Sequence, residues 1–315
     1  MRDGRPVVLV TGASGFIGRH LVPVLEGNGW AVRQALRTPP GSTSDVLINP
    51  IGPTTEWQAA LAGVDSIVHL AARVHHPHEE HSVELYRRAN IEGTLHLARC
   101  AMNEGVRQFI FVSTILVNGR STDGRGAFNE SDTLTPRGIY GKSKAAAESG
   151  LETMVQDGNM HVTVIRPPLV YGAGAKGNFR LLARAVQLGI PLPFGSIQNR
   201  RAFVAVENLS SFIVHRLARL TVPFDVFIVA DAEQVSTSEF VRRLSIAAGV
   251  RTRLFPLPVP LLRPLLKMSG RAEMHDSIIG SLELDVSKAA ATGWRPVVTL
   301  DEGLRLAAAG VVGDS

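Results

Sequence analysis

A tyrosine and a lysine lie four residues apart, at positions 140 and 144, in the stretch IYGKSKAAAE. On a helix this spacing puts Tyr140 and Lys144 one turn apart on the same face, where the ammonium can lie beside the phenol. A nearby cation lowers the pKa of a phenol, normally about 10, because it favours the phenolate. Such a tyrosine could move a proton while a redox cofactor moves a hydride. Since Tyr-xxx-Lys is also common in ordinary helices, the pair needs support from other residues.

Two other polar positions give that support. The apolar run FIFVST ends in Ser113 and Thr114, at the carboxyl edge of a predicted strand, where open α/β sheets bind their ligands. A hydroxyl there could hold a substrate oxygen. Asn90 lies in RRANIEGTLHLA, among helix positions that look buried, and a polar residue in such a place usually satisfies a backbone or water network.

A glycine-rich segment, VLVTGASGFIG, follows the first predicted strand and begins a helix. Gly12 permits a tight turn, Gly15 lets the backbone approach a pyrophosphate, and Gly18 lets the helix pack closely on the strand. The helix N-terminus supplies N–H groups and the positive end of its dipole. The segment therefore predicts a dinucleotide site, whose contacts include Gly12, Ser14, Gly15, Phe16, Ile17 and Gly18.

These residues need a scaffold, and short apolar runs alternate with helical stretches from residue 7 to about residue 170. We expect strands at 7–10, 32–36, 66–71, 109–114 and 162–167, and helices near 16–28, 56–62, 83–104 and 140–156. This alternation is typical of a parallel sheet covered on both faces. The predicted fold class is α/β: a Rossmann doubly wound parallel sheet with a smaller, mixed C-terminal substrate-binding domain.

The second half of the chain is organised differently. After residue 170 the alternation weakens, and Gly/Pro-rich stretches such as YGAGAKGN and GIPLPFGS appear. We expect residues 1–170, with a returning segment near 202–230, to form the dinucleotide-binding domain. Residues 171–201 and 231–315 would mainly form the substrate-binding domain, with a helix that begins in a capping box at Ser236 and Glu239.

The composition argues against several classes of protein. Hydrophobic residues make up 45% and charged residues 19%, the balance of a globular chain. The net charge is +5, but the basic residues are scattered rather than clustered, so we expect no nucleic-acid partner. A single cysteine, Cys100, fits a reducing, cytoplasmic setting. The apolar stretch 254–268 contains four prolines and two basic residues, so we expect no membrane insertion.

Taken in order, TGxxGxxG, HLAA, Asn90, Ser-Thr and YxxxK resemble the extended short-chain dehydrogenase/reductase family. Its nucleotide-sugar members also match RPPLVYG and NRRAFVAVENL, so the resemblance spans essentially the whole chain. It implies that Tyr140 is the acid/base, that Lys144 lowers its pKa and binds the nicotinamide ribose, and that Thr114 hydrogen-bonds the reacting sugar oxygen. The further implied cofactor contacts are Leu70, Ala71, Ala72, Asn90, Ser113, Pro167 and Leu169.

The resemblance also implies a UDP-sugar substrate, whose diphosphate Asn178 and Arg201 would hold. HLAARVHHPHEEH has four histidines within seven residues, at 75, 76, 78 and 81, and a zinc site is the alternative to a polar loop. Hydride transfer needs no metal, so we expect none and place His75 in the sugar pocket. Relatives commonly pair through helices of the dinucleotide domain, which leaves a homodimer open.

The residue after the second strand bears on the reaction. A carboxylate there binds the ribose of NAD, whereas an arginine accommodates the 2′-phosphate of NADP, and this chain has Arg37. We therefore expect NADP, with NAD as the alternative. Dehydratases of the family resemble one another in an acidic pair after the catalytic hydroxyl, where this chain has Ile115 and Leu116. That difference argues against dehydration.

A preference for NADPH favours net reduction, because a reductase exchanges its cofactor at every turnover and an epimerase does not. The main hypothesis is hydride transfer at C4 of a UDP-hexose, namely reduction of a UDP-4-keto-6-deoxy-N-acetylhexosamine in bacterial surface polysaccharide synthesis. The alternative is a UDP-glucose or UDP-N-acetylglucosamine 4-epimerase with tightly bound NAD. A steroid or flavonoid ketone reductase and a non-catalytic NADP sensor are remoter alternatives.

Overall fold

The computed structural model describes residues 4–39, 41–74, 82–156, 159–219, 222–258, 260–262 and 277–312. The chain forms two compact units. The first comprises 1–118, 133–166 and 210–227, and the second comprises 119–132, 167–209 and 228–315. The segment 119–132 was expected in the dinucleotide-binding part. It belongs to the second unit because Thr122 and Phe128 bond to the backbone of Ser281 and Glu283.

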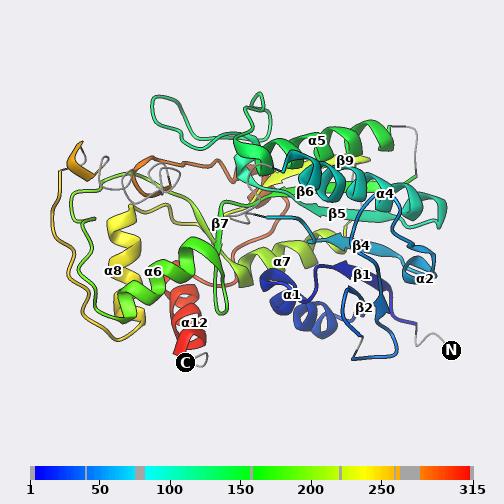
Figure 1. Cartoon of the computed structure of the whole chain (residues 1–315), viewed down its shortest axis with the longest axis horizontal. Coiled ribbons are helices and arrows are strands. Elements are labelled where there is room, and N and C mark those ends of the chain that lie inside the picture. The colour runs from blue at the N-terminus through cyan, green and yellow to red at the C-terminus, as the bar shows by residue number, and fades with distance from the viewer. Residues whose placement is uncertain are drawn as a thin grey trace. The chain divides into compact units, whose positions relative to one another are not determined.

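The first unit is built on a seven-stranded sheet with the strand order β3-β2-β1-β4-β5-β6-β9 (Figure 1). The strands are β1 (Val7–Thr11), β2 (Ala31–Leu36), β3 (Val46–Leu47), β4 (Ser66–His69), β5 (Gln108–Val112), β6 (His161–Arg166) and β9 (Phe224–Ile228). The neighbours from β3 to β6 pair in parallel. The expected doubly wound α/β sheet is confirmed, and its strand order reverses between β1 and β4, where such folds bind ligands.

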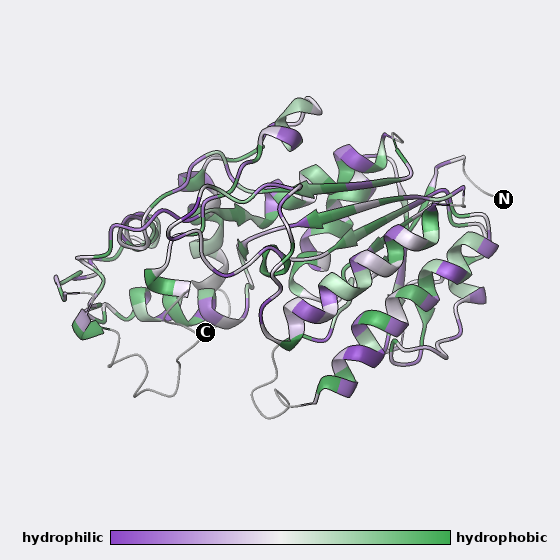
Figure 2. Cartoon of the chain, turned by 90° about the horizontal axis from the view of Figure 1, so that it is seen from above, coloured by the Kyte–Doolittle hydropathy of each residue, from purple (hydrophilic) through white to green (hydrophobic). Residues whose placement is uncertain are grey.

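Helices cover both faces of this sheet, with α1 and α7 on one side and α4 and α5 on the other (Figure 1). They are α1 (Phe16–Gly27), α2 (Gln58–Leu61), α3 (Val83–Tyr86), α4 (Gly93–Asn103), α5 (Gly138–Val155) and α7 (Val206–Leu217). Alternate strand residues face opposite ways, so Phe109 and Phe111 join a core with Leu97 and Leu151 while Ile110 is buried on the other side. The central strands are accordingly mostly apolar, with polar residues such as His69 and Gln108 at their ends (Figure 2).

The predicted helix at 83–104 is interrupted. A π-helical turn, Arg87–Glu92, lies between α3 and α4, and it contains Asn90. Such turns are often found at functional sites, because they shift side chains out of the regular helical register. Periodicity alone gives no sign of this turn.

The second unit has a two-stranded parallel sheet of β7 (Leu169–Tyr171) and β8 (Phe203–Ala205). Its helices are α6 (Gly177–Gln187), α8 (Thr237–Ala247), α11 (Ser287–Ala291) and α12 (Leu300–Val312). The Ser236 hydroxyl accepts the Glu239 N–H and caps α8 as expected, but the Glu239 carboxylate bonds to Arg243 instead of closing the box. Among the described residues, no helix is long and apolar enough to cross a membrane.

Candidate active site

The glycine-rich turn after β1 has the geometry that its sequence predicts. Gly12 has a φ of +73°, which L side chains rarely adopt. A Cβ at Gly18 would lie 2.4 Å from the Gly12 carbonyl oxygen, so only glycine lets α1 start this close to the turn. Gly15 is the N-cap of α1 without a side-chain bond, and the first turn holds no acidic residue.

These features fit a nicotinamide dinucleotide. The first N–H groups of α1 have no intrahelical partner and no capping side chain, so they are available to an anion. The positive end of the helix dipole also favours a pyrophosphate at this place. Ser14, Phe16 and Ile17 would hold it through the backbone, next to Gly15. Leu70, Ala71 and Ala72 follow β4, the strand beside β1, and the Ala71 N–H donates to the Thr11 hydroxyl at 3.3 Å.

Tyr140 and Lys144 lie in the first two turns of α5. Tyr140 is half-buried, and its hydroxyl makes no hydrogen bond within the described part of the chain. Lys144 is 1% exposed, and its Nζ lies 3.7 Å from the centroid of the Phe111 ring. The buried ammonium is therefore stabilised by a cation–π contact instead of a full ion pair.

The electrostatics of the pair differ from the sequence prediction. Burial raises the pKa of Tyr140 to about 12, and Tyr86 adds to the rise, whereas Lys144 was expected to lower it. Burial lowers the pKa of Lys144 itself to about 7, against the opposing effect of Glu148. Both shifts have one physical cause: an apolar surrounding disfavours the charged form of each group. In the ligand-free chain, Tyr140 is therefore a neutral phenol.

Ser113 and Thr114 follow β5 but have different surroundings. Ser113 is 3% exposed and its hydroxyl donates to the Glu148 carboxylate, so its predicted contact to the cofactor stays a prediction. Glu148 also accepts from the Arg166 guanidinium, with an Nη2 to Oε2 distance of 2.6 Å. The Arg166 Nη1 also donates to the Asn118 side-chain oxygen at 3.2 Å. We call Ser113, Asn118, Glu148 and Arg166 the buried network.

Thr114 is half-buried and begins the 3-10 turn Ile115–Val117, where its Oγ1 accepts the Leu116 N–H at 3.3 Å. That bond uses a lone pair and leaves the hydroxyl proton able to donate. Thr114 is therefore the hydroxyl after β5 that is suited to a substrate oxygen.

Asn90 is 1% exposed and joins two parts of the first unit. Its side-chain oxygen accepts the Arg73 N–H at 2.7 Å, and its amide donates to the Arg73 carbonyl and the Ser143 hydroxyl. Both amide protons are thus used within the protein. Asn90 thus fixes the segment after β4 against α5, as a buried polar residue in a backbone network does, and its contact to the cofactor stays a prediction.

His69 is a residue of this region that the sequence interpretation missed. It is fully buried at the end of β4, with Nδ1 2.7 Å from the Thr11 hydroxyl and Nε2 3.0 Å from the Thr94 hydroxyl. Burial, together with Lys144, lowers its pKa to about 3, so the imidazole is neutral at physiological pH. Its place in HLAA, two residues before Ala71, was the available signal.

Arg37 directly follows β2 and is exposed. β2 pairs with β1, so Arg37 and the glycine turn lie at the carboxyl ends of neighbouring strands. No hydrogen bond or ion pair holds its guanidinium within the described residues. An unpaired arginine at this edge fits the sequence prediction of a 2′-phosphate contact.

The other predicted residues belong to the second unit or lie outside the described residues. Pro167 is buried, Leu169 is 39% exposed, and Asn178 is exposed near the start of α6. Arg201 is 7% exposed and donates to the Gly280 carbonyl. His75 and the three histidines that follow it lie outside the described residues.

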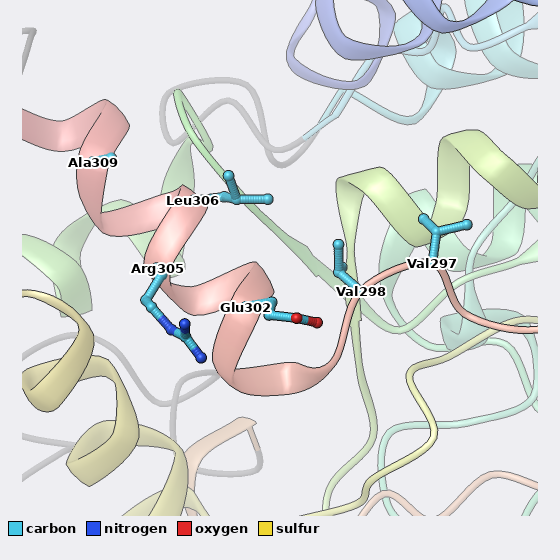
Figure 3. A pocket seen from close by; sticks show the side chains of 6 residues that line it. All are labelled: Val297, Val298, Glu302, Arg305, Leu306 and Ala309. Atoms are coloured by element: carbon cyan, nitrogen blue, oxygen red, sulfur yellow. The ribbon is translucent and has the colours of Figure 1, made fainter.

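The second unit also has an open hollow along α12 and the segment before it (Figure 3). None of the predicted site residues lines it. Its carboxylate, Glu302, accepts the backbone N–H and the hydroxyl of Thr299, both at 2.8 Å, and so serves as a helix cap. The hollow therefore offers no group arranged for catalysis.

Comparison with known proteins agrees with this geometry. Residues 8–229 match the family described as the NAD dependent epimerase/dehydratase family. The chain is 38% identical over 305 residues to the UDP-glucose 4-epimerase of Vibrio cholerae, covering 95% of this chain and 93% of the relative.

Solved structures agree in fold. A UDP-glucuronic acid 4-epimerase from Bacillus cereus in complex with NAD matches with a TM-score of 0.78 at 22% identity, covering 98% of this chain and 99% of the other. RMD from Pseudomonas aeruginosa, complexed with NADPH, matches with a TM-score of 0.75 at 23% identity, covering 97% and 98%. The Rossmann sheet, its glycine turn and the extent of the sequence match together show that the chain is an enzyme of the NAD dependent epimerase/dehydratase family.

Proposed function

We propose that the chain is a UDP-hexose 4-epimerase that keeps a nicotinamide cofactor through the reaction. The observation that carries the proposal is the 38% identity to a UDP-glucose 4-epimerase over nearly the full length of both chains. The epimerase was the alternative in the sequence interpretation, and it replaces 4-keto reduction as the leading function. Ile115 and Leu116, which supply neither acid nor base after Thr114, continue to argue against dehydration.

The reaction needs a proton acceptor at the C4 hydroxyl. The nicotinamide, when bound, supplies a reversible acceptor for the hydride from C4. Tyr140 takes the hydroxyl proton at its Oη and returns it when the opposite epimer forms, so no proton or hydride is gained or lost over the cycle. Because the pKa of Tyr140 is raised to about 12 in the ligand-free chain, bound cofactor and substrate have to lower it for this role.

Substrate contacts follow from the same proposal. Thr114 donates to the reacting sugar oxygen with the hydroxyl proton that its capping bond leaves available. Asn178 and Arg201 stay the proposed contacts to the diphosphate, since a forked guanidinium suits it. Arg201 also donates to the Gly280 carbonyl, a bond that helps to orient its guanidinium.

The test uses the purified protein with UDP-glucose and, separately, with UDP-N-acetylglucosamine, and separates the epimers by chromatography. We expect interconversion of at least one pair without net consumption of cofactor. Release of NAD or NADP from the denatured protein identifies the bound form. If neither sugar is epimerised while a UDP-4-keto sugar is reduced at the expense of NADPH, the proposal is wrong.

Reduction with NADPH remains the second candidate, because Arg37 is exposed and unpaired at the end of β2. On this alternative, Arg37→Asp should move the preference from NADPH toward NADH, since a carboxylate repels the 2′-phosphate and accepts from a ribose hydroxyl. Arg19→Gln, an exposed change on α1, is the control and should leave the preference as it is. If Arg37→Asp and the unchanged chain prefer NADPH over NADH to the same extent, Arg37 gives no support for NADP.

A further inference from the structure

The ends of α6 and α8 in the second unit have an unusual surface. Leu188, two thirds exposed, directly follows α6, and Ile190 comes two residues later. Phe255 is 43% exposed in the segment that follows α8. Large apolar side chains exposed singly are ordinary, but several gathered in one place call for an explanation.

Backbone hydrogen bonds bring the two segments together. The Leu192 N–H donates to the Arg253 carbonyl at 2.9 Å, and the Phe255 N–H donates to the Leu192 carbonyl at 3.1 Å. The Thr252 hydroxyl also donates to the Val186 carbonyl at the end of α6, at 3.3 Å. The residues after α6 are therefore held beside the residues after α8, and α6 and α8 themselves pack together (Figure 1).

The same surface carries three arginines. Arg251, Arg253 and Phe255 are exposed while Thr252 and Leu254 between them are half-buried, the alternation of an extended segment. Arg184 is exposed one helical turn before Leu188. We call Arg184, Leu188, Ile190, Arg251, Arg253 and Phe255 the cationic apolar patch.

No carboxylate belongs to these segments. Residues 173–206 and residues 240–262 contain neither Asp nor Glu. The nearby acids of α8 and α12 are engaged elsewhere: Glu239 pairs with Arg242 and Arg243, and Asp301 lies 3.5 Å from Arg243. The two segments that form the patch thus contribute positive and apolar side chains, and no carboxylate among their described residues.

We propose that the cationic apolar patch docks the protein on an anionic phospholipid bilayer. Apolar side chains enter the boundary between headgroups and acyl chains, while arginines keep their guanidinium groups at the lipid phosphates. A second copy of the chain is a poorer partner, because a two-fold contact through this patch places one positively charged surface against an identical one. The proposal concerns a surface of the second unit and does not depend on which reaction the enzyme performs.

The experiment is sedimentation of the full-length protein with sucrose-loaded vesicles. One set contains phosphatidylglycerol in phosphatidylcholine, and the other contains phosphatidylcholine alone. We expect binding to the anionic vesicles that weakens as salt is raised, and little binding to the neutral ones. Equal binding to both sets, or none to either, would contradict the proposal.

Two double variants separate the contributions of charge and apolar contact. Arg251→Gln with Arg253→Gln should lower partitioning to anionic vesicles by roughly tenfold, because each basic residue near the membrane adds to the attraction. Leu188→Ser with Phe255→Ser should lower it by a similar factor. The matched control, Arg305→Gln with Leu306→Ser, changes an exposed pair on α12 beside Glu302 and should bind like the unchanged protein.

All variants should keep their turnover in free solution, which shows that they fold. A control variant that loses binding as much as the patch variants would show that any basic apolar surface suffices and would overturn the proposal. Light scattering distinguishes the other partner: if the patch variants change the mass of the protein in solution instead of its vesicle binding, the patch is a contact between copies.

Discussion

The polar groups of the first unit fall into two regions with opposite surroundings. In the buried network, Ser113, Glu148 and Arg166 bond to one another and are nearly inaccessible to solvent. At the open edge, formed by Thr114, Tyr140 and Arg37, the side chains are half-buried or exposed and keep donors unused. Ser113 and Thr114 are adjacent in sequence, yet one belongs to each region. The first region fixes the positions of β5, β6 and α5, and the second is available to ligands.

The largest effect should come from the open edge. Tyr140→Phe removes the group that moves the proton, so we expect turnover to fall by about 1,000-fold with cofactor binding retained. Steady-state rates and a cofactor titration measure the two quantities.

The matched control is Tyr86→Phe. The Tyr86 hydroxyl donates to the Val74 carbonyl at 3.3 Å, so its loss should cost about 1 kcal/mol of stability. Because Tyr86 only adds to the rise in the Tyr140 pKa, turnover should fall far less than in Tyr140→Phe. Activity preserved in Tyr140→Phe would refute the role given to Tyr140.

Changes in the buried network should affect the stability of the protein more than its turnover. Glu148→Ala leaves the Arg166 guanidinium buried without its carboxylate, and we expect the free energy of unfolding to fall by about 3 kcal/mol or more. Urea denaturation measures this loss. Glu84→Ala breaks the exposed pair with Arg87 and should change the stability little, because solvent screens such a pair. Similar losses in the two variants would mean that the network is no more important than a surface pair.

Because of His69, the stability of the first unit should depend on pH. Its pKa is about 3 in the folded chain against 6.5 for a free histidine, so the unfolded chain binds the extra proton between these values. Stability therefore falls as the pH is lowered from 6.5 toward 3, by about 2 kcal/mol down to pH 5. His69→Gln removes this contribution, and urea curves of both chains at several pH values measure it. Parallel pH profiles would show that His69 is not the group that titrates.

The smallest effect should come from Ser143, which joins Asn90 to the backbone of Tyr140 at the open edge. Ser143→Ala removes the hydroxyl that accepts from Asn90 and donates to the Tyr140 carbonyl at 2.8 Å. We expect a loss of about 1 kcal/mol in stability and a fall in turnover of less than about tenfold. A loss of turnover as large as in Tyr140→Phe would place Ser143 in the chemistry itself.

The sequence predicted the first region's scaffold better than its polar contacts. Five strands and the glycine turn follow from apolar runs and from backbone constraints that are local, so they could be found from the sequence. The two-residue strand β3 is too short to show a pattern, and the π-helical turn at Arg87–Glu92 has no periodic signature. The roles of Asn90 and Ser113 depend on partners 53 and 35 residues away in the chain, which no local pattern reveals.

The direction of the Tyr140 pKa shift was predicted wrongly for a related reason. The Tyr-Lys spacing sets how far apart two side chains start, but not how deeply each is buried or that the Lys144 ammonium lies over Phe111. Burial then raises the phenol pKa in the absence of ligand. The Glu148–Arg166 pair gave no clear local signal, because α5 carries other charged residues, among them Lys142 and Glu152.

In the proposed reaction, the hydride leaves C4 of a UDP-hexose and returns to the same carbon. This return is tested most directly with UDP-glucose carrying deuterium at C4, followed by mass spectrometry and NMR of both epimers. We expect interconversion with the deuterium retained at C4 and no net change in cofactor absorbance. Loss of the deuterium to the cofactor pool, or no epimerisation together with consumption of NADPH by a UDP-4-keto sugar, would contradict it.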